Sequence, residues 1–576
     1  MARKETSKIL LFVFVPCLVF TFIILMHEKT ILYIQDTFGA LLIATIYCIF
    51  LIYALTITNK NAKNLSDKII WIILILFSFG VLIVSLVRPS IGWDTWQVYD
   101  MSKYVFSDFG FMDQIRQHIL NTHYEMAFPP LFPCLMAFVN MVFDLGVNSS
   151  VYLNAIFVLL CFCELSIIFK KLHLEFAGCV TACLFFMGSL YVSTYANGLT
   201  QTIGYYLLIR LCRIIICEDK YDWHLSLNCG LCCGFLLMNR FDALAIVAVM
   251  FFAIPFLMYK KCSKKEIFLS IILYCCTVIV ICSPWIIYSL YHFDSIFITD
   301  NGRRLFNIPD TRPSTFFSES NPALTIKDSF FDWLVAFSGR ALDATKSFAK
   351  GMIRYTIVLE VIAACAFFAK KTKQTITDIK IDSKMICVFA IILGQEALFN
   401  FTGYNDVRYH LPILFLIQLF SIYCFFQCAK SVKWKRPAIV LMAFLAIVSY
   451  AKIGYFTNPI KTINEFMTGG GYHKNLVLTE YEKNIKDYLS NDCNTICFYR
   501  SETEFDFLKF SAESQISNII SPANLSTENV YEFVDTFDVN YLYSSNEEVV
   551  DIFNTKLRLH DTPYQNLYKV EKGAFL

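Results

Sequence analysis

Long apolar blocks constrain the fold of this chain more than any other feature. One of them, Ile69–Val87, is long enough to cross the hydrocarbon core of a bilayer, which takes about 20 residues of helix. Of the 576 residues, 56% are hydrophobic and 17% are charged, against roughly 45–50% and about 25% in soluble proteins. The sequence therefore predicts an α-helical polytopic membrane protein and excludes a cytosolic enzyme, a disordered scaffold and a fibre. The net charge of +2 gives no reason to expect a nucleic-acid partner.

Hydropathy predicts about thirteen transmembrane helices, and a shorter apolar segment ending at Val142 is expected to be a juxtamembrane or half-inserted helix. Residues 1–68 form an extra N-terminal transmembrane hairpin, and residues 69–455 form the main transmembrane module. The predicted spans cover about residues 9–26, 39–57, 69–87, 151–169, 177–194, 200–217, 225–239, 241–259, 267–287, 353–369, 385–401, 411–428 and 437–454.

Lysine and arginine concentrate in every second connection between these spans. Because basic residues favour the cytoplasmic side, this bias places the N-terminus in the cytoplasm of a membrane protein, with the plasma membrane as the expected site. The three long connecting segments, 88–150, 288–352 and 456–576, then all lie on the outer side. The chemistry is expected there, so ATP or a nucleotide-sugar is not expected as the direct substrate. The basic connections lie at residues 3–8, 60–68, 170–171, 220, 260–265, 370–384 and 430–436.

Residues 456–576 are more polar than the rest and are predicted to form a small extracytoplasmic α/β domain. Thr495–Arg500 and Val539–Ser544 alternate like strands, whereas Glu480–Leu489 and Asn546–Asn554 have the pattern of short helices.

The 22 cysteines lie mostly inside apolar blocks. Cys229 and Cys232 have the spacing of a metal or redox motif, but no second pair accompanies them. They are expected to pack as small hydrophobic side chains.

The most informative polar stretch follows the third span. Pro89 and Gly92 interrupt the helix, and Asp94 comes within a few residues of the membrane surface. From the residues alone, Asp94 is as readily a helix N-cap as a functional acid. The loop then continues through His118, His123 and Glu125, which could form a metal site, contact an acceptor or be plainly solvated.

Three motifs, in this order, resemble the GT-C superfamily of glycosyltransferases. In the first motif, Asp94 follows a span, and Pro129-Pro130-Leu131 comes about forty residues later. In the second, residues 283–294 resemble a Pro-Trp segment that leads into an outer loop. In the third, residues 407–412 resemble an Arg-Tyr-x-x-Pro signature. The closest branch is that of the protein O-mannosyltransferases and the lipid A aminoarabinose transferase. The resemblance covers about residues 70–455.

The resemblance implies transfer of a sugar from a polyprenyl-phosphate carrier to an acceptor hydroxyl on the outer face. Asp94 occupies the position of the general base, and direct displacement inverts the anomeric centre. The carrier phosphate needs cationic donors, and the planar fork of arginine suits it. The expected donor-binding residues are Arg408 first, with Tyr409 beside it, and then Arg303, Arg304 and Arg240.

Further residues are expected to contact the acceptor or shape the outer loops. Glu396 lies inside a span near its outer end, where it either pairs with Arg408 or contacts substrate. Glu164 is interpreted as structural, and Arg210 is expected to extend to the inner surface. The amphipathic segment 331–350 either lies in the membrane interface or packs on the bundle. The expected acceptor or loop contacts are Asp100, His123, Glu125, Asn197 and Glu396.

Three positions depart from the family pattern. Thr95 replaces the second acid of an Asp-Glu pair, Asn197 stands where many relatives carry an acid, and Phe128 replaces a lysine. Two alternatives therefore stay open beside the transferase: a lipid-linked glycan flippase or other transporter, and an inactive relative that binds glycans. No cofactor is assigned. The acceptor could be a protein, a lipid or another glycan of the cell envelope.

Overall fold

The structure, a computed structural model, describes about half of the chain. Predicted spans at 9–26, 39–57, 69–87, 353–369 and 437–454 lie outside the described residues, as does the span at 177–194 except for Thr194. The count of thirteen therefore stays a prediction. The described residues are 95, 98, 99, 102, 129–171, 194, 198–219, 221–259, 261–293, 330–351, 383–402, 409–411, 413, 414, 416, 417, 479–489, 495–498, 518–520, 526–528, 530–536 and 538–571.

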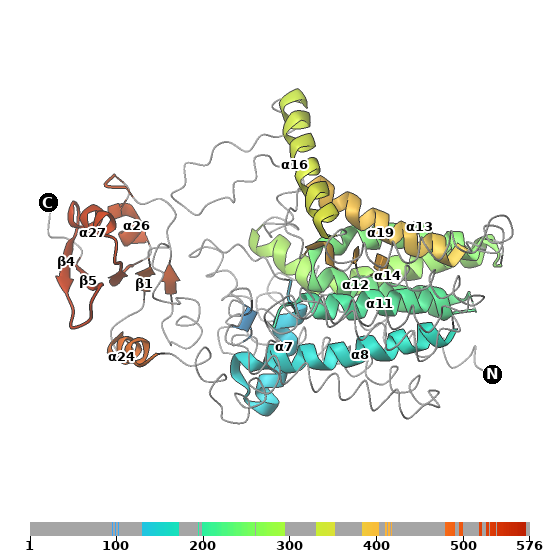
Figure 1. The fold of residues 1–576 in the computed structure, drawn as a ribbon, viewed down its shortest axis with the longest axis horizontal. Helices are drawn as coiled ribbons and strands as arrows, with labels where there is room; N and C mark the ends of the chain where they lie inside the picture. The colour runs from blue at the N-terminus through green and yellow to red at the C-terminus, as the bar shows by residue number, and fades with distance from the viewer. Residues whose placement is uncertain are drawn as a thin grey trace, which may run out of the picture.

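The described part of the transmembrane module is a bundle of helices (Figure 1). Their bounds agree within a few residues with the spans that hydropathy predicts, except that α14 is longer than its predicted span at both ends. The helices are α7 (Leu131–Phe143), α8 (Ser149–Lys171), α11 (Gln201–Cys217), α12 (Trp223–Asn239), α14 (Lys264–Phe293), α13 (Leu244–Met258) and α19 (Ser383–Thr402). Short 3-10 turns, η2 (Gly146–Asn148) and η3 (Phe241–Ala243), precede α8 and α13.

Four of these helical segments are long and apolar enough to cross a membrane: Gly146–Lys171, Phe241–Met258, Lys264–Ile287 and Ser383–Asn400. Large apolar side chains on three of them are exposed, because the bundle offers them no cover. Phe252 is 70% exposed, Phe268 63% and Leu393 60%. Such a surface is stable against lipid and not against water. The helical membrane class predicted from the sequence is therefore supported by the chain's own helices.

Two glycines one turn apart allow α12 and α14 to pack closely. A Cβ atom at Gly230 would lie 2.7 Å from Cβ of Thr277, and one at Gly234 would lie 2.8 Å from Cβ of Ile281. Neither distance is sterically allowed, so only glycine fits. Close approach through small residues four positions apart is a common way for membrane helices to associate. Between the glycines, Cys232 is buried as a free thiol, as predicted.

A buried ion cluster joins α8 to α11. Glu164 is fully buried, and its Oε1 lies 2.8 Å from Nη1 of Arg210, whose side chain is 2% exposed. Arg213 pairs with the other carboxylate oxygen, and Tyr206 accepts a hydrogen bond of 3.2 Å from Arg210. The expectation that Arg210 extends to the inner surface is wrong. The carboxylate of Glu164 supplies the countercharge inside the bundle, so the guanidinium does not need water.

Glu164→Gln is expected to destabilise the protein by about 3–5 kcal/mol, because it leaves two arginines without their countercharge. The measurement is the melting temperature of the detergent-purified chain. The matched control is Glu266→Gln, which removes a carboxylate that caps α14 at the exposed Ser263. Equal melting temperatures for the two variants would contradict a stabilising role for the cluster.

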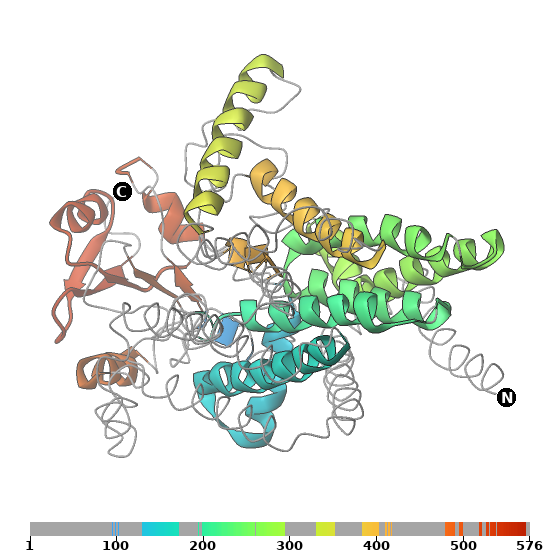
Figure 2. The ribbon, with the colours of Figure 1, turned by 45° about the vertical axis from the view of Figure 1, so that its right-hand side comes forward.

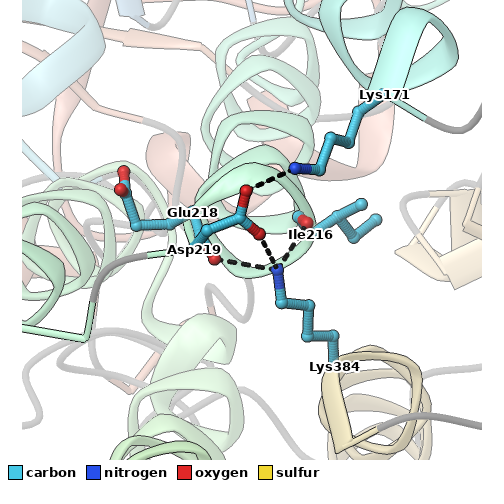
Figure 3. A network of polar contacts seen from close by, with 5 residues as sticks. All are labelled: Lys171, Ile216, Glu218, Asp219 and Lys384. Atoms are coloured by element: carbon cyan, nitrogen blue, oxygen red, sulfur yellow. Dashed lines mark hydrogen bonds and ion pairs between the residues drawn. The ribbon is translucent and has the colours of Figure 1, made fainter.

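The ends of three helices meet at a group of charged residues, which we name the lysine end: Lys171, Asp219 and Lys384 (Figure 3). Lys171 at the end of α8 donates to Asp219 at 2.5 Å, and Lys384 at the start of α19 donates to it at 3.3 Å. Lys384 also donates to the carbonyls of Ile216 and Glu218, at 2.9 and 2.8 Å, where α11 leaves them without helical partners. Three connections that the sequence predicts to share one side of the membrane thus lie together.

The two lysines hold the pKa of Asp219 below its ordinary value of 3.8, with Lys171 the larger cause. A lowered pKa in the folded protein stabilises the fold at neutral pH, and this contribution disappears as the pH falls through the lowered value. Asp219→Asn is therefore expected to lower the melting temperature at pH 7, and its difference from the unmodified chain should vanish in strong acid.

The control for this pH dependence is Asp343→Asn. Asp343 pairs at 3.0 Å with Lys346 on the same helix, and both side chains are well exposed. Asp219 is 68% exposed as well, but it has two lysine partners, of which Lys384 is only 13% exposed. The single exposed pair of Asp343 contributes little to stability. If the effect of Asp219→Asn does not change with pH, ionisation of Asp219 does not contribute to stability.

Helix α16 (Phe330–Gly351) follows the amphipathic segment of the sequence. Figures 1 and 2 show it extending away from the bundle, with only its later turns beside α19. Ala344 is buried there, whereas Phe331 is 77% exposed and Val335 70% exposed. Of the two expected arrangements, packing on the bundle holds for the later turns.

The described residues after Thr479 form a five-stranded mixed sheet in the order β2-β1-β3-β5-β4. The central strand β3 (Tyr541–Tyr543) pairs in parallel with β1 (Thr495–Phe498), and β1 pairs in parallel with β2 (Asn518–Ile520). On its other side, β3 pairs antiparallel with β5 (Leu567–Glu571), which pairs antiparallel with β4 (Arg558–Asp561). The helices are α24 (Glu480–Leu489), α26 (Val530–Thr536) and α27 (Glu547–Asn554). Helix α24 has the predicted bounds. The domain boundary at 456 and its outer location stay predictions.

Candidate functional site

The structure describes three of the site residues predicted from the sequence: Arg240, Tyr409 and Glu396. All three lie in one region, and two of them are in contact. The other candidates lie outside the described residues, so their predicted roles stay predictions. They are Asp94, Asp100, His123, Glu125, Asn197, Arg303, Arg304 and Arg408.

Arg240 ends α12 in an extended conformation, with φ −156° and ψ 126°. Its backbone turns away from the helix axis, and the side chain folds back over the next two residues. Nε lies 3.1 and 3.0 Å from the two carboxylate oxygens of Asp242, and Nη2 lies 2.7 Å from Oδ2. Both side chains are largely buried, 16% and 6% exposed. A paired guanidinium held in this way keeps its plane before any ligand arrives.

Helical residues are described at 409–411, 413, 414, 416 and 417, a segment that we call the late helix. Tyr409, its first described residue, lies against the same guanidinium. Cζ of Arg240 is 5.2 Å from the centroid of the tyrosine ring, a cation–π distance. A third element joins them, because Nε2 of Gln395 on α19 donates to the backbone carbonyl of Asp242 at 2.8 Å. We call Arg240, Asp242, Gln395 and Tyr409 the arginine cluster. It lies at the end of α12 that is remote from the lysine end.

Glu396 is next to Gln395, and its carboxylate binds His410. Oε2 lies 2.9 Å from Nδ1 of His410, which is fully buried, and Nδ2 of Asn400 lies 3.4 Å from Oε1. The expected partner, Arg408, lies outside the described residues. His410 has no assigned role among the residues predicted from the sequence, although it directly follows Arg408 and Tyr409 and lies opposite an acid in a span.

The start of the segment after Asp94, predicted to be the first outer loop, is packed against residues 198–200, which we call the pre-α11 loop. Thr95, the residue after Asp94, is buried, and a Cβ atom at Gly198 would lie 2.8 Å from its Cγ2 and 2.2 Å from Oγ of Ser150. Gly198 has a φ of +72°, which disfavours any side chain. The backbone can follow this path only because the residue is glycine.

Two asparagines inside the bundle hold the pre-α11 loop. Asn154 on α8 donates to the carbonyl of Leu199 at 3.1 Å, and Asn239 on α12 donates to that of Thr200 at 3.2 Å. Since Asn239 directly precedes Arg240, an unbroken series of contacts leads from the first outer loop to the arginine cluster. Neither asparagine is among the residues predicted from the sequence, although a polar residue within a predicted span is a signal of function.

Gly198→Ala is expected to destabilise the protein by about 1–3 kcal/mol, since the added methyl group overlaps two side chains and requires a strained φ. Gly339→Ala is the matched control, because a Cβ atom at Gly339 meets nothing within 4 Å. It should be neutral or slightly stabilising in its helix. Thermal unfolding of the two purified variants gives the comparison, and unchanged unfolding of Gly198→Ala would refute the close packing.

Within the described ranges, no group of three or more His, Cys, Asp and Glu side chains could hold a metal ion. His118, His123 and Glu125, the candidates from the sequence, lie outside those ranges.

The sequence matches no protein-family model and no curated protein. Solved structures similar to this chain include the Archaeoglobus fulgidus oligosaccharyltransferase in the apo form, at 8% identity and a TM-score of 0.49, covering 89% of this chain and 75% of that one. ArnT from Cupriavidus metallidurans bound to undecaprenyl phosphate has 11% identity and a TM-score of 0.48, covering 88% and 98%. Both are GT-C glycosyltransferases, the superfamily that the sequence motifs resemble. With TM-scores below 0.5, the similarity assigns no role to any residue here.

Proposed function

We propose that this chain is a membrane glycosyltransferase that moves a sugar from a polyprenyl-phosphate carrier to an acceptor hydroxyl on the outer face. The observation that carries the proposal is the contact between Arg240 and Tyr409. Asp242 orients the guanidinium of Arg240, and Tyr409, which the guanidinium contacts, is the first described residue after Arg408. The contact lies at the membrane end opposite the lysines, where positive-inside topology places the outer leaflet.

The chemistry requires one cationic site and one base. The acceptor oxygen forms a bond to the anomeric carbon while the bond from that carbon to the carrier phosphate breaks, and the electron pair stays with the phosphate. Arginine stabilises the charge that develops there. Asp94 takes the hydroxyl proton, and the single displacement inverts the anomeric centre. These roles for Asp94 and for inversion follow from the motif resemblance.

Asp242 offsets one unit of the positive charge at Arg240, so a second cation is needed for a phosphate. We assign that role to Arg408, the neighbour of Tyr409, with Arg303 and Arg304 as further donors. Arg240 then orients the phosphate. The roles of Asp100, His123, Glu125 and Asn197 as acceptor or loop contacts belong to the same proposal.

Cells that lack the protein and receive a variant test this function. Asp94→Asn is expected to reduce sugar transfer by about 10²–10⁴-fold, because it removes the base. Arg240→Lys should reduce transfer by about tenfold or more, since lysine cannot replace a fork that binds through two nitrogens. The readouts are the glycans of the cell envelope and the accumulated polyprenyl-phosphate sugar.

Lys346→Gln, an exposed change on α16, serves as the control and should restore transfer fully. Full restoration by Asp94→Asn would rule out this residue as the base. Restoration by Arg240→Lys would remove Arg240 from the donor site.

One observation favours the second candidate, a transporter of lipid-linked glycans. Glu164, Arg210 and Arg213 are charges inside the bundle, the feature that a transport pathway needs. Each of them is paired, which fits a structural role better. Proteoliposomes with a fluorescent polyprenyl-phosphate sugar separate the two functions. Movement across the bilayer without an acceptor, unaffected by Asp94→Asn, would favour the transporter.

A further inference from the structure

His410 lies where three helical elements meet. Its imidazole is fully buried, with Nδ1 2.9 Å from Oε2 of Glu396 on α19. The ring of Phe399 on α19 approaches it edge-on at 5.2 Å, and the ring of Phe348 on α16 lies at 5.7 Å. In surroundings of low dielectric constant, a hydrogen bond between a carboxylate and an imidazole is strong, and it fixes the orientation of the ring.

The carboxylate also joins a short polar network that reaches α16. Asn400 lies 3.4 Å from Oε1 of Glu396, and Oγ1 of Thr345 donates to Oδ1 of Asn400 at 2.9 Å. Thr345 and Asn400 are 55 positions apart in the sequence. The network therefore fixes the later turns of α16 and the start of the late helix to the same side of α19.

Two adjacent residues of α19 hold the two halves of the arginine cluster. Gln395 binds the carbonyl of Asp242, whose side chain orients Arg240. Glu396 binds His410, which follows Tyr409 directly. One turn of α19 therefore determines the distance of 5.2 Å between the guanidinium of Arg240 and the ring of Tyr409.

We propose that Glu396 and His410 are positioning residues for the carrier phosphate. The pair fixes the described start of the late helix, and with it Tyr409, against Arg240. The inference rests on the proposed function and deepens it, because it names what determines the geometry of the phosphate site. Neither residue needs to touch the lipid. Misplacing a binding group by about 1 Å is enough to cost a large factor in rate.

The test uses the full chain purified in detergent and undecaprenyl phosphate as the probe. Glu396→Ala is expected to weaken binding by about tenfold, which corresponds to ~1.4 kcal/mol. Glu396→Gln should bind within about threefold of the unmodified chain, since its amide oxygen can still accept a hydrogen bond from the imidazole. Binding is measured as the rise in melting temperature with lipid concentration.

The chain offers a matched control in its sheet, where Glu571 pairs with His560 at 2.7 Å and both are about half exposed. Glu571→Ala removes the same chemistry from a remote place and should leave lipid binding unchanged. Glu396→Ala also lowers stability, because it leaves the buried imidazole without its carboxylate, so the variants are compared at equal distance below their own melting temperatures. A positioning role predicts weaker binding by Glu396→Ala under that condition, together with recovery in Glu396→Gln. A purely structural role would not show this recovery at equal stability.

Two outcomes separate the failure of this inference from that of the proposed function. If Arg240→Ala abolishes binding and Glu396→Ala does not weaken it, the positioning role is wrong and the phosphate site stands. If Arg240→Ala also binds undecaprenyl phosphate normally, the proposed donor site is wrong. Should Glu396→Ala fail to fold, His410→Asn takes its place, and normal binding by that variant overturns the inference.

Discussion

A polar side chain on one helix that binds a polar group on another is the contact on which this bundle depends. A membrane supplies no water to satisfy a stray carboxylate or carbonyl, so each such group inside the bundle needs a partner. Glu164 binds arginines of α11, Asn154 and Asn239 bind the carbonyls of a loop, and Gln395 binds the carbonyl of Asp242. These contacts specify which helices are neighbours, which apolar surfaces alone do not.

The two ends of the bundle differ in what their charges do. At the lysine end, Lys171 and Lys384 share Asp219, and the backbone ends of α11 complete the contacts of Lys384. At the other end, Asp242 orients Arg240, and an aromatic ring lies against the guanidinium. The first arrangement closes a junction between helices. The second holds a largely buried guanidinium in a fixed orientation.

Hydropathy could predict where helices begin and end, because each span in a bilayer is governed by its own length and composition. It placed α8, α11 and α12 within two residues of their bounds, and helix α24 followed from its pattern. The partners of charged residues could not be predicted, since hydropathy treats each residue alone. For that reason Arg210 was expected at the surface and His410 was overlooked. Strands β1 and β3 lie inside the alternating segments predicted at 495–500 and 539–544, whereas no strand is predicted at β2, β4 or β5.

The absence of side chains at Gly230 and Gly234 has a consequence at the far end of α14. One turn beyond Ile281, Trp285 is almost completely buried, and its ring lies 6.2 Å from that of Phe241, the residue after Arg240. The depth to which α14 nests into α12 therefore decides where Trp285 meets Phe241. The small size of two residues thus sets the position of an aromatic contact beside Arg240.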